Sequence, residues 1–381
     1  MKVALVIDSL AKGGAERQAL LSARVLAARG CNVELIRYFK EADEYEEGGC
    51  APARAVLIEK RNRPLRFFVR LVRYLRRGKF DVVHAFKETP CIYGCLAAAV
   101  AGVPVRLAGY RAQVSPPGMA RRMLQLVNRT ASAWIPNSQG VAETLVEYLG
   151  VDRGRLHVIH NGIDVPALAS RLDRGEARRR LELPVDAPTV AMVAALRPEK
   201  NHGMFVRMAD EVRHSIPNAQ FLIVGDTGRS DDDAHARLRA MAEVCGVANR
   251  IHFLGQRSDI PDVLAAVDVS VLTSDHEGLS NALLESMAVG KAVVTTDYRG
   301  ADEVVTHGVD GFITPRGDAR AMGKCVSQLL TDVELRTRVG EQARRTVTER
   351  FSVDALADRL IAVYQQYLPG GEAHMQRPQV G

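Results

Sequence analysis

Short apolar segments recur along the chain, and most are followed by a turn and a helical pattern. The first covers residues 2–8; two glycines and helical spacing over 16–29 follow it. A strand, a helix and a further strand in this order form a unit of a parallel sheet. Later strands of this series are predicted at residues 31–37, 80–84, 105–108, 133–136 and 156–159. The pattern therefore predicts an α/β fold.

The same pattern begins again near residue 189, after an arginine-rich stretch over 166–188 that contains three prolines. The strands of this second series are predicted at 189–194, 220–224, 250–254, 267–272 and 292–296. We therefore predict two Rossmann-like, doubly wound domains that face a central cleft. The first covers residues 1–170 and the second 171–352. A helix at 353–368 and a disordered tail at 369–381 follow them.

Positive charge is concentrated in the first part of the chain. The net charge of the 381 residues is +6, but residues 1–170 alone carry 25 Lys plus Arg against 15 Asp plus Glu. This indicates an anionic surface or substrate near the first domain. The six cysteines have no CxxC spacing, so no disulfide framework or zinc site is predicted. No secretory signal is visible, and the longest uncharged stretch, 89–105, is broken by prolines and glycines.

Two glutamates lie eight residues apart, Glu277 in a loop after a predicted strand and Glu285 on the helix that follows. Backbone N–H groups at the start of a helix favour a phosphate or another anion. Carboxylates beside them suit the hydroxyl groups of sugar and ribose. Two unrelated surface glutamates would show the same spacing, so that alternative stays open. The N–H groups concerned belong to Gly278, Leu279, Ser280 and Asn281.

Two cations, Arg197 and Lys200, follow the first strand of the second series. Fixed cations there could neutralise a diphosphate leaving group, although a solvated basic turn is the alternative. After the first strand of the chain, Gly13 and Gly14 would let the backbone approach a ligand closely. They do not form a G-x-G-x-x-G motif, so a dinucleotide site is poorly supported.

Together these features resemble glycosyltransferase family 4, whose members have the GT-B fold. The resemblance covers residues 1–368 and is strongest over 190–315. It rests on GGAE at 13–16, NGID at 161–164, RPEKN at 197–201, FLG at 253–255, EGLSNALLE at 277–285 and GFITP at 311–315.

The resemblance implies that a hexosyl group moves from a nucleotide-diphosphate sugar to an acceptor with retention of configuration, without a metal ion or other cofactor. The second domain should hold the donor and the first the acceptor, with the last helix crossing back to the first domain. Arg197 and Lys200 would bind the diphosphate and act with Glu277 in catalysis. Glu277 would contact the donor sugar, and Glu285 the ribose.

Further residues follow from the same resemblance. Gly14, beside Gly13, would let its loop pass near the diphosphate, and Arg257 would lie near the nucleobase. Many members carry an arginine at the position of Ala195, whereas here Arg197 comes two residues later. Many also carry a histidine in the first domain that this chain lacks. The candidates for acceptor contact are His84, Lys87 and Arg111.

Residues 60–79 contain nine Lys or Arg and no acid, and from Leu65 onward they predict an amphipathic helix. Its predicted basic face holds Arg66, Arg70, Arg73 and Arg77, and its apolar stripe Leu65, Phe68, Val72 and Leu75. An ordinary domain helix with solvated arginines is one interpretation. The other is a peripheral contact with anionic lipid, suited to an acceptor on a lipid carrier.

We therefore expect a cytoplasmic glycosyltransferase, peripheral on the inner face of the cell membrane, that builds a surface polysaccharide or glycolipid. Its partners would be a nucleotide sugar and a glycan or polyprenyl-linked acceptor, and no nucleic acid. Three alternatives stay open: a nucleotide-sugar epimerase of the GT-B type, a disaccharide phosphorylase, and an inactive nucleotide-sugar-binding subunit.

Overall fold

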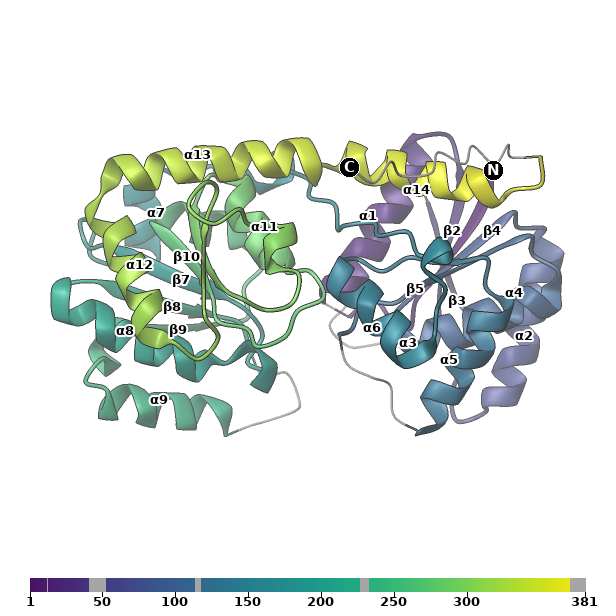
Figure 1. Ribbon diagram of the computed structural model, residues 1–381, viewed down its shortest axis with the longest axis horizontal. Coiled ribbons are helices and arrows are strands. Elements are labelled where there is room, and N and C mark those ends of the chain that lie inside the picture. The colour runs from purple at the N-terminus through teal and green to yellow at the C-terminus, as the bar shows by residue number, and fades with distance from the viewer. Residues whose placement is uncertain (12, 41–52, 114–117, 227–232, 371–381) are drawn as a thin grey trace. The chain divides into compact units, whose positions relative to one another are not determined.

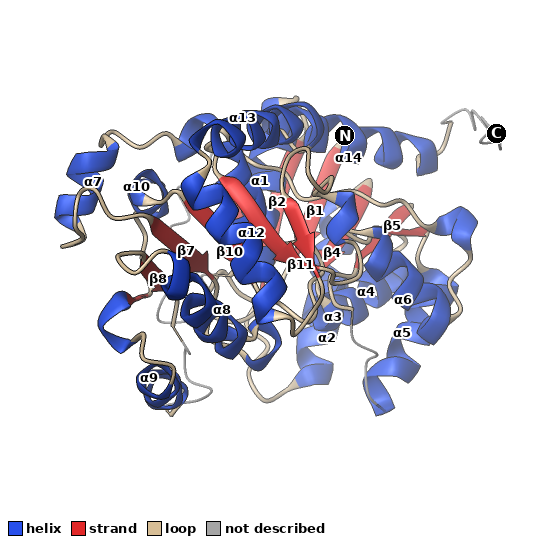
Figure 2. Cartoon of the chain, turned by 60° about the vertical axis from the view of Figure 1, so that its left-hand side comes forward, coloured by secondary structure: helices blue, strands red, loops and turns tan. Residues whose placement is uncertain are grey.

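The structure is a computed structural model that describes residues 1–370 except residue 12 and the segments 41–52, 114–117 and 227–232. It divides into two compact units. The first runs from Met1 to Gly162 and resumes at Val353, and the second is Ile163–Ser352. Figures 1 and 2 show that each unit is a twisted parallel sheet with helices on its faces.

The first unit holds a six-stranded sheet in the order β3-β2-β1-β4-β5-β6, which is the doubly wound Rossmann order. Its strands are β1 (Lys2–Val6), β2 (Asn32–Arg37), β3 (Arg54–Leu57), β4 (Val82–Phe86), β5 (Val105–Gly109) and β6 (Ala133–Trp134). Its helices are α1 (Gly14–Ala28), α2 (Pro64–Gly78), α3 (Glu88–Pro90), α4 (Leu96–Ala101), α5 (Gly118–Thr130), α6 (Gln139–Leu149) and α14 (Val353–Tyr367), with a π-helical turn at Cys91–Cys95.

The second unit repeats this order as β12-β11-β10-β7-β8-β9. Its strands are β7 (Thr189–Val193), β8 (Gln220–Val224), β9 (Ile251–Gly255), β10 (Val269–Leu272), β11 (Ala292–Thr296) and β12 (Phe312–Thr314). Its α-helices are α7 (Arg174–Arg180), α8 (His202–Ser215), α9 (Ala234–Val244), α10 (Ile260–Ala266), α11 (Asn281–Ala288), α12 (Ala319–Thr331) and α13 (Val333–Arg350). The predicted fold class is confirmed.

Each sheet buries both of its faces, which explains why its strands are apolar without alternation. In the first unit, α1 and α14 cover one face, and α2, α4, α5 and α6 cover the other. Helix α14 packs against α1 although more than 300 residues separate them in the sequence (Figure 1). The last helix thus belongs to the first unit.

The boundary between the units lies between Gly162 and Ile163 rather than after residue 170. The backbone N–H of Ile163 donates to the carbonyl of Phe351 at 2.7 Å, and Leu168 packs in the core of the second unit. The segment 163–170 is therefore part of the second unit, because its apolar side chains are buried there and not in the first.

Three further predictions differ from the structure. The segment 156–159 is not a strand; Leu156 makes one isolated bridge with Trp134. Strand β4 begins and ends two residues later than predicted, so that His84 lies within it. In α2 the buried side chains are those of Phe67, Leu71, Val72 and Leu75, whereas Leu65 is 81% exposed. The predicted tail beyond residue 370 lies outside the described residues.

Candidate active site

The predicted motifs follow the two neighbouring strands at which the strand order of each sheet reverses. In the second unit these neighbours are β7 and β10, and in the first β1 and β4. Ligands of open parallel sheets bind outside the carboxyl ends of such strands. The RPEKN turn follows β7 and the 273–280 loop follows β10. Each unit therefore presents a candidate site at its switch point.

In the second unit, Lys200 forms an ion pair with Glu277, and the ammonium contacts Oε1 of the carboxylate. The hydroxyl of Ser274, which is fully buried, donates to the same oxygen at 2.7 Å. Lys200 and Ser274 therefore bind the same carboxylate oxygen, Oε1. These contacts fix the orientation of the carboxylate and leave Oε2 for a ligand. The predicted diphosphate ligand Lys200 and the predicted sugar ligand Glu277 are thus direct neighbours.

Hydrogen bonds join the RPEKN turn to the 273–280 loop. The hydroxyl of Thr273 lies 2.8 Å from the carbonyl oxygen of Lys200 and 3.0 Å from that of Asn201. The amide of Asn201 donates to Asp275 at 3.2 Å, and the N–H of Asp275 donates to the carbonyl of Glu199 at 2.8 Å. These bonds hold the two loops together. A catalytic site needs such fixed positions for the groups that surround its ligand.

Helix α11 begins at Asn281, the residue at which the sequence predicts its start. Ser280 is the N-cap, and its hydroxyl accepts a hydrogen bond from the N–H of Leu283. Leu279 is buried in the core, so its backbone rather than its side chain is available to a ligand. Asn281 is the first residue of α11, and Gly278 lies in the loop before it. Glu285 is buried on the second turn of the helix, with 4% of its surface exposed.

Arg197 and Arg257 have different surroundings. Arg197 is exposed, and its guanidinium has no hydrogen-bond or ion-pair partner among the described residues. Arg257 follows the edge strand β9 and forms two hydrogen bonds with Asp259, at 2.8 and 2.6 Å. These bonds raise the pKa of Arg257 and lower that of Asp259. Arg197 is therefore an exposed cation in the same turn as Lys200, whereas Arg257 is neutralised by Asp259.

The sequence analysis did not identify Tyr298, which follows β11. Its side chain is buried, and its hydroxyl has no partner among the described residues. Burial raises the pKa of Tyr298, and the negative charge of Glu277 raises it further. This neutral hydroxyl near Glu277 is a further candidate for ligand contact. The sequence offered one signal for this residue: Tyr298 is polar and comes two positions after the strand predicted at 292–296.

In the first unit, Gly13 is the N-cap of α1 and Gly14 its first residue, at the carboxyl end of β1. A side chain at Gly13 would meet the carboxylate of Glu16, which instead forms an ion pair with Lys87 at 2.7 Å. Lys87 also pairs with Asp8, which follows β1, at 2.7 Å. Burial lowers the pKa of Lys87, but these two carboxylates outweigh that effect and raise it overall.

The backbone of Lys87 has φ 76° and ψ 170°. Glycine is essentially the only residue that adopts this region without strain, and strained residues cluster at functional sites. The N–H of Lys87 donates to Gly109 on the neighbouring strand at 3.0 Å, which holds the conformation in place. Of the three predicted acceptor contacts, Lys87 is the one with a strained backbone.

His84 lies within the core of the first unit, with 1% of its surface exposed. Its Nδ1 lies 2.8 Å from the hydroxyl of Tyr364 on α14, and its ring stacks on Phe86. Burial lowers the pKa of His84 to about 3, so the ring is neutral. His84 therefore does not reach the surface that an acceptor would contact. It faces inward because alternate residues of β4 point toward α14.

Arg111 follows β5 and donates to the side chain of Asn161 at 2.5 Å. Its guanidinium lies over the ring of Phe86, with 4.9 Å between the guanidinium carbon and the ring centroid. Burial lowers the pKa of Arg111 to about 10, which leaves it charged at neutral pH. Arg111 and Lys87 thus place two cations at the carboxyl edge of this sheet. Asp8, Glu16 and Asn161 are partners that the sequence analysis did not single out.

The chain matches two protein-family models, which together cover most of it. The family model "Glycosyltransferase Family 4" matches residues 12–166, and "Glycosyl transferases group 1" matches residues 173–346. The first match ends and the second begins close to the boundary between the two units. Each unit therefore corresponds to one of the two glycosyltransferase families.

Several relatives of known name are glycosyltransferases. A lipopolysaccharide core biosynthesis glycosyltransferase of Rhizobium meliloti is 31% identical over 60% of this chain, and the match spans 63% of that protein. A UDP-Gal:α-D-GlcNAc-diphosphoundecaprenol α-1,3-galactosyltransferase of Escherichia coli is 26% identical, with 79% of each chain covered. This chain thus spans less than two thirds of the length of the Rhizobium protein.

Solved structures share the fold. HepE of Anabaena in complex with UDP-glucose is 24% identical, with 95% of this chain and 99% of that chain covered and a TM-score of 0.83. A Rickettsia africae glycosyltransferase is 18% identical, with 96% and 98% covered and a TM-score of 0.84. The two matched models and these likenesses agree with the order of the sheets: the chain belongs to the family 4 type of glycosyltransferases, which adopt the GT-B fold.

Proposed function

We propose that the chain is a retaining hexosyltransferase that uses a nucleotide-diphosphate sugar and needs no metal ion. The carrying observation is the ion pair of Lys200 with Glu277 in the loops that precede α8 and α11, with Arg197 exposed in the same turn as Lys200. Two cations and a helix N-terminus suit the charge of a diphosphate. The complex of Anabaena HepE with UDP-glucose supports a donor of this class.

The leaving diphosphate gains negative charge as the sugar bond breaks, and Arg197 and Lys200 stabilise that charge. Glu277 offers Oε2 to the sugar hydroxyls, since Oε1 is held by Lys200 and Ser274. A carboxylate held in this way is a poor nucleophile. The acceptor hydroxyl therefore attacks from the face that the diphosphate leaves, and its proton passes to the diphosphate, which retains the configuration.

Positive charge takes the place of a metal ion in this mechanism. Among the described residues, no group of three or more His, Cys, Asp or Glu side chains is arranged to hold a metal. Here the cations beside the diphosphate site are Arg197 and Lys200.

The acceptor binds to the first unit, where Lys87 and Arg111 lie at the carboxyl edge of the sheet. We infer a glycan or polyprenyl-linked acceptor in the synthesis of a surface polysaccharide or glycolipid. The names of the Rhizobium and Escherichia coli relatives support this class. Ammonium and guanidinium groups there suit a phosphate or the oxygens of a sugar.

The enzyme reaches a lipid-linked acceptor by binding an anionic membrane surface at the cytoplasmic face through α2. Arg66, Arg70, Arg73 and Arg77 are exposed, and the last three line a hollow of about 630 Å³. Leu65 is 81% and Val69 44% exposed on the same helix. Basic and apolar side chains together are typical of peripheral membrane helices. No described helix combines the length and apolarity that crossing a membrane requires.

The test is a panel of nucleotide sugars, each incubated with and without a polyprenyl-diphosphate-linked sugar. We expect one donor to release nucleoside diphosphate in proportion to glycosylated lipid, with the anomeric configuration of the donor retained in the product. Release of an epimerised nucleotide sugar without diphosphate would replace this proposal with an isomerase. An inverted product would disprove the retaining mechanism.

A further inference from the structure

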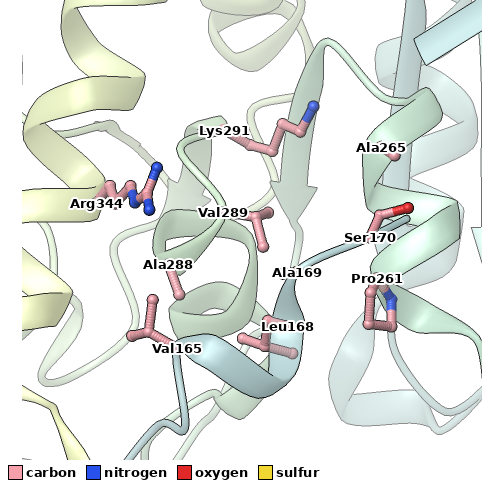
Figure 3. Close-up of a pocket in the computed structure, with 10 residues that line it drawn as sticks. All are labelled: Val165, Leu168, Ala169, Ser170, Pro261, Ala265, Ala288, Val289, Lys291 and Arg344. Carbon is pink, nitrogen blue, oxygen red and sulfur yellow. The ribbon is translucent and has the colours of Figure 1, made fainter. Parts of the chain in front are cut away.

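The second unit contains a pocket that is separate from the candidate donor site. Its volume is about 240 Å³, and it lies among α10, α11, α13 and the segment 165–170 (Figure 3). Lys291, on its wall, comes directly before β11 and therefore marks the amino edge of the sheet. The donor site is at the carboxyl edge, so the length of a strand, about 15 Å, separates the two sites.

Most of the residues that line the pocket are apolar. Val165, Leu168, Ala288 and Val289 form one part of it, and Pro261 and Ala265 of α10 form another (Figure 3). The volume is below the range of roughly 300–1,000 Å³ that is usual for ligand sites. The pocket therefore suits a molecule much smaller than a nucleotide sugar.

Two cations interrupt this apolar wall, and none of the described lining residues is acidic. Arg344 extends from α13 toward the end of α11 (Figure 3). Its guanidinium has no hydrogen-bond or ion-pair partner among the described residues. Lys291 is half-buried and uses one of its three donors on the carbonyl of Val267, at 2.9 Å. Both cations thus have donors left for a ligand.

Positive charge near Lys291 exceeds negative charge. The nearby carboxylate of Asp268 is already paired with Arg174 at 2.8 Å and with Arg178 at 2.6 Å. Burial and these two arginines lower the pKa of Lys291 to about 8, although Asp268 acts in the opposite direction. A bound anion would offset this excess of positive charge.

We propose that the pocket binds a small organic anion, a carboxylate or phosphate on an apolar body, with Lys291 and Arg344 as its cationic partners. The apolar body would contact Leu168 and Ala288, which line the same pocket as the two cations (Figure 3). The hydroxyl of Ser170 is not needed, because it already donates to Asp262 at 2.8 Å.

The experiment is calorimetric titration of the full chain with benzoate, phenyl phosphate and inorganic phosphate. The protein carries Arg197→Ala and Lys200→Ala, so that a phosphate does not report on the donor site. We expect benzoate or phenyl phosphate to bind more tightly than inorganic phosphate. Arg344→Gln and Lys291→Met should each weaken binding about tenfold, as expected for the loss of a charged partner.

The matched control is Arg345→Gln, since Arg345 is an exposed neighbour that does not line the pocket. The Arg345→Gln variant should bind the probes with the same affinity as the protein that keeps Arg345. Because Arg344 is exposed, the Arg344→Gln variant should fold. It therefore tests the proposal even if the Lys291→Met variant does not fold. The proposal is overturned if neither organic probe binds at 10 mM, a concentration of roughly 1,000-fold that of the protein. Equal binding by the Arg344→Gln and Arg345→Gln variants would overturn it as well.

Discussion

Lys200 and Glu277 are joined by an ion pair in which the lysine ammonium contacts Oε1 of the carboxylate. The two side chains come from loops after different strands, β7 and β10, and both are largely buried. A diphosphate in the donor site would add negative charge beside this pair. The pair therefore orients Lys200 in the unliganded protein, and in the proposed mechanism the exposed Arg197 remains free to pair with the diphosphate.

We predict that Arg197→Ala and Lys200→Ala each lower kcat about 10²–10³-fold. The charge on the diphosphate grows in the transition state, so losing a preorganised cation slows the chemical step. Steady-state kinetics with the donor identified in the panel gives the measurement. Arg207→Ala, an exposed change on α8, is the control and should leave kcat unchanged. Unaltered kcat in both site variants would place the leaving-group site elsewhere.

Glu285→Ala should raise the KM for the donor while kcat changes little. A contact with ribose exists in the ground state and the transition state alike, so its loss weakens binding uniformly. Because Glu285 is buried, circular dichroism must first establish that the variant is folded. A fall in kcat at unchanged KM would contradict a ribose contact.

The strained backbone of Lys87 leads to a prediction about stability. Lys87→Gly and Lys87→Ala both remove the ion pairs with Asp8 and Glu16, but only glycine relieves φ 76° and ψ 170°. We expect the glycine variant to be more stable than the alanine variant by about 1–2 kcal/mol. Urea unfolding of the two variants measures this difference.

The same two variants test the function of Lys87. Both should raise the KM for the acceptor several-fold without changing the KM for the donor, because we propose that the lost ammonium contacts the acceptor. If acceptor kinetics are unchanged, Lys87 serves only the structure of the first unit.

Activity should survive chelation. The cations proposed to stabilise the leaving group are side chains, so EDTA should leave the rate of diphosphate release unchanged within experimental error. The comparison is made with and without added Mg²⁺ or Mn²⁺. Complete loss in EDTA that either metal restores would show that a metal ion is required.

Membrane binding should depend on α2. Each basic residue near an anionic surface contributes about 1 kcal/mol, so changing Arg66, Arg70, Arg73 and Arg77 to glutamine should abolish binding to anionic vesicles at low salt. Because Leu65 is exposed, Leu65→Ser should weaken the binding that persists at higher salt. Co-sedimentation with vesicles measures both effects.

A matched control changes four exposed cations of the second unit to glutamine: Arg207, Arg320, Lys324 and Arg338. It removes the same charge and should bind vesicles almost like the unmodified protein. Equal losses in both quadruple variants would mean that net charge, rather than α2, determines binding. Failure of the unmodified protein to bind at low salt would favour a soluble acceptor.

Local sequence was sufficient to predict both doubly wound sheets and the site motifs after β7 and β10. Strands β8 and β11 have the predicted bounds, because buried parallel strands are short, continuous apolar runs that turns interrupt. The start of α11 was equally predictable, since a serine N-cap and the helix that follows depend on neighbouring residues.

Other features depended on packing between distant segments. The isolated apolar segment 156–159 resembles a strand, but it makes only one bridge to the two-residue strand β6. Leu65 continues the apolar spacing of α2, yet it is exposed, whereas Phe67 in the same turn is buried in the core. Periodicity alone does not tell which apolar side chains find partners.

The sequence by itself determined which residues follow which strands, and the sheet order then gathered them at the switch points. Only the tertiary structure decided how they are paired: Lys200 with Glu277, Lys87 with Asp8 and Glu16, and His84 with Tyr364. Each pair joins segments at least 70 residues apart, as in the contact between Lys200 and Glu277 with its separation of 77. Ion pairs and hydrogen bonds depend on distances of a few ångströms, which follow from the packing of whole elements and not from local spacing.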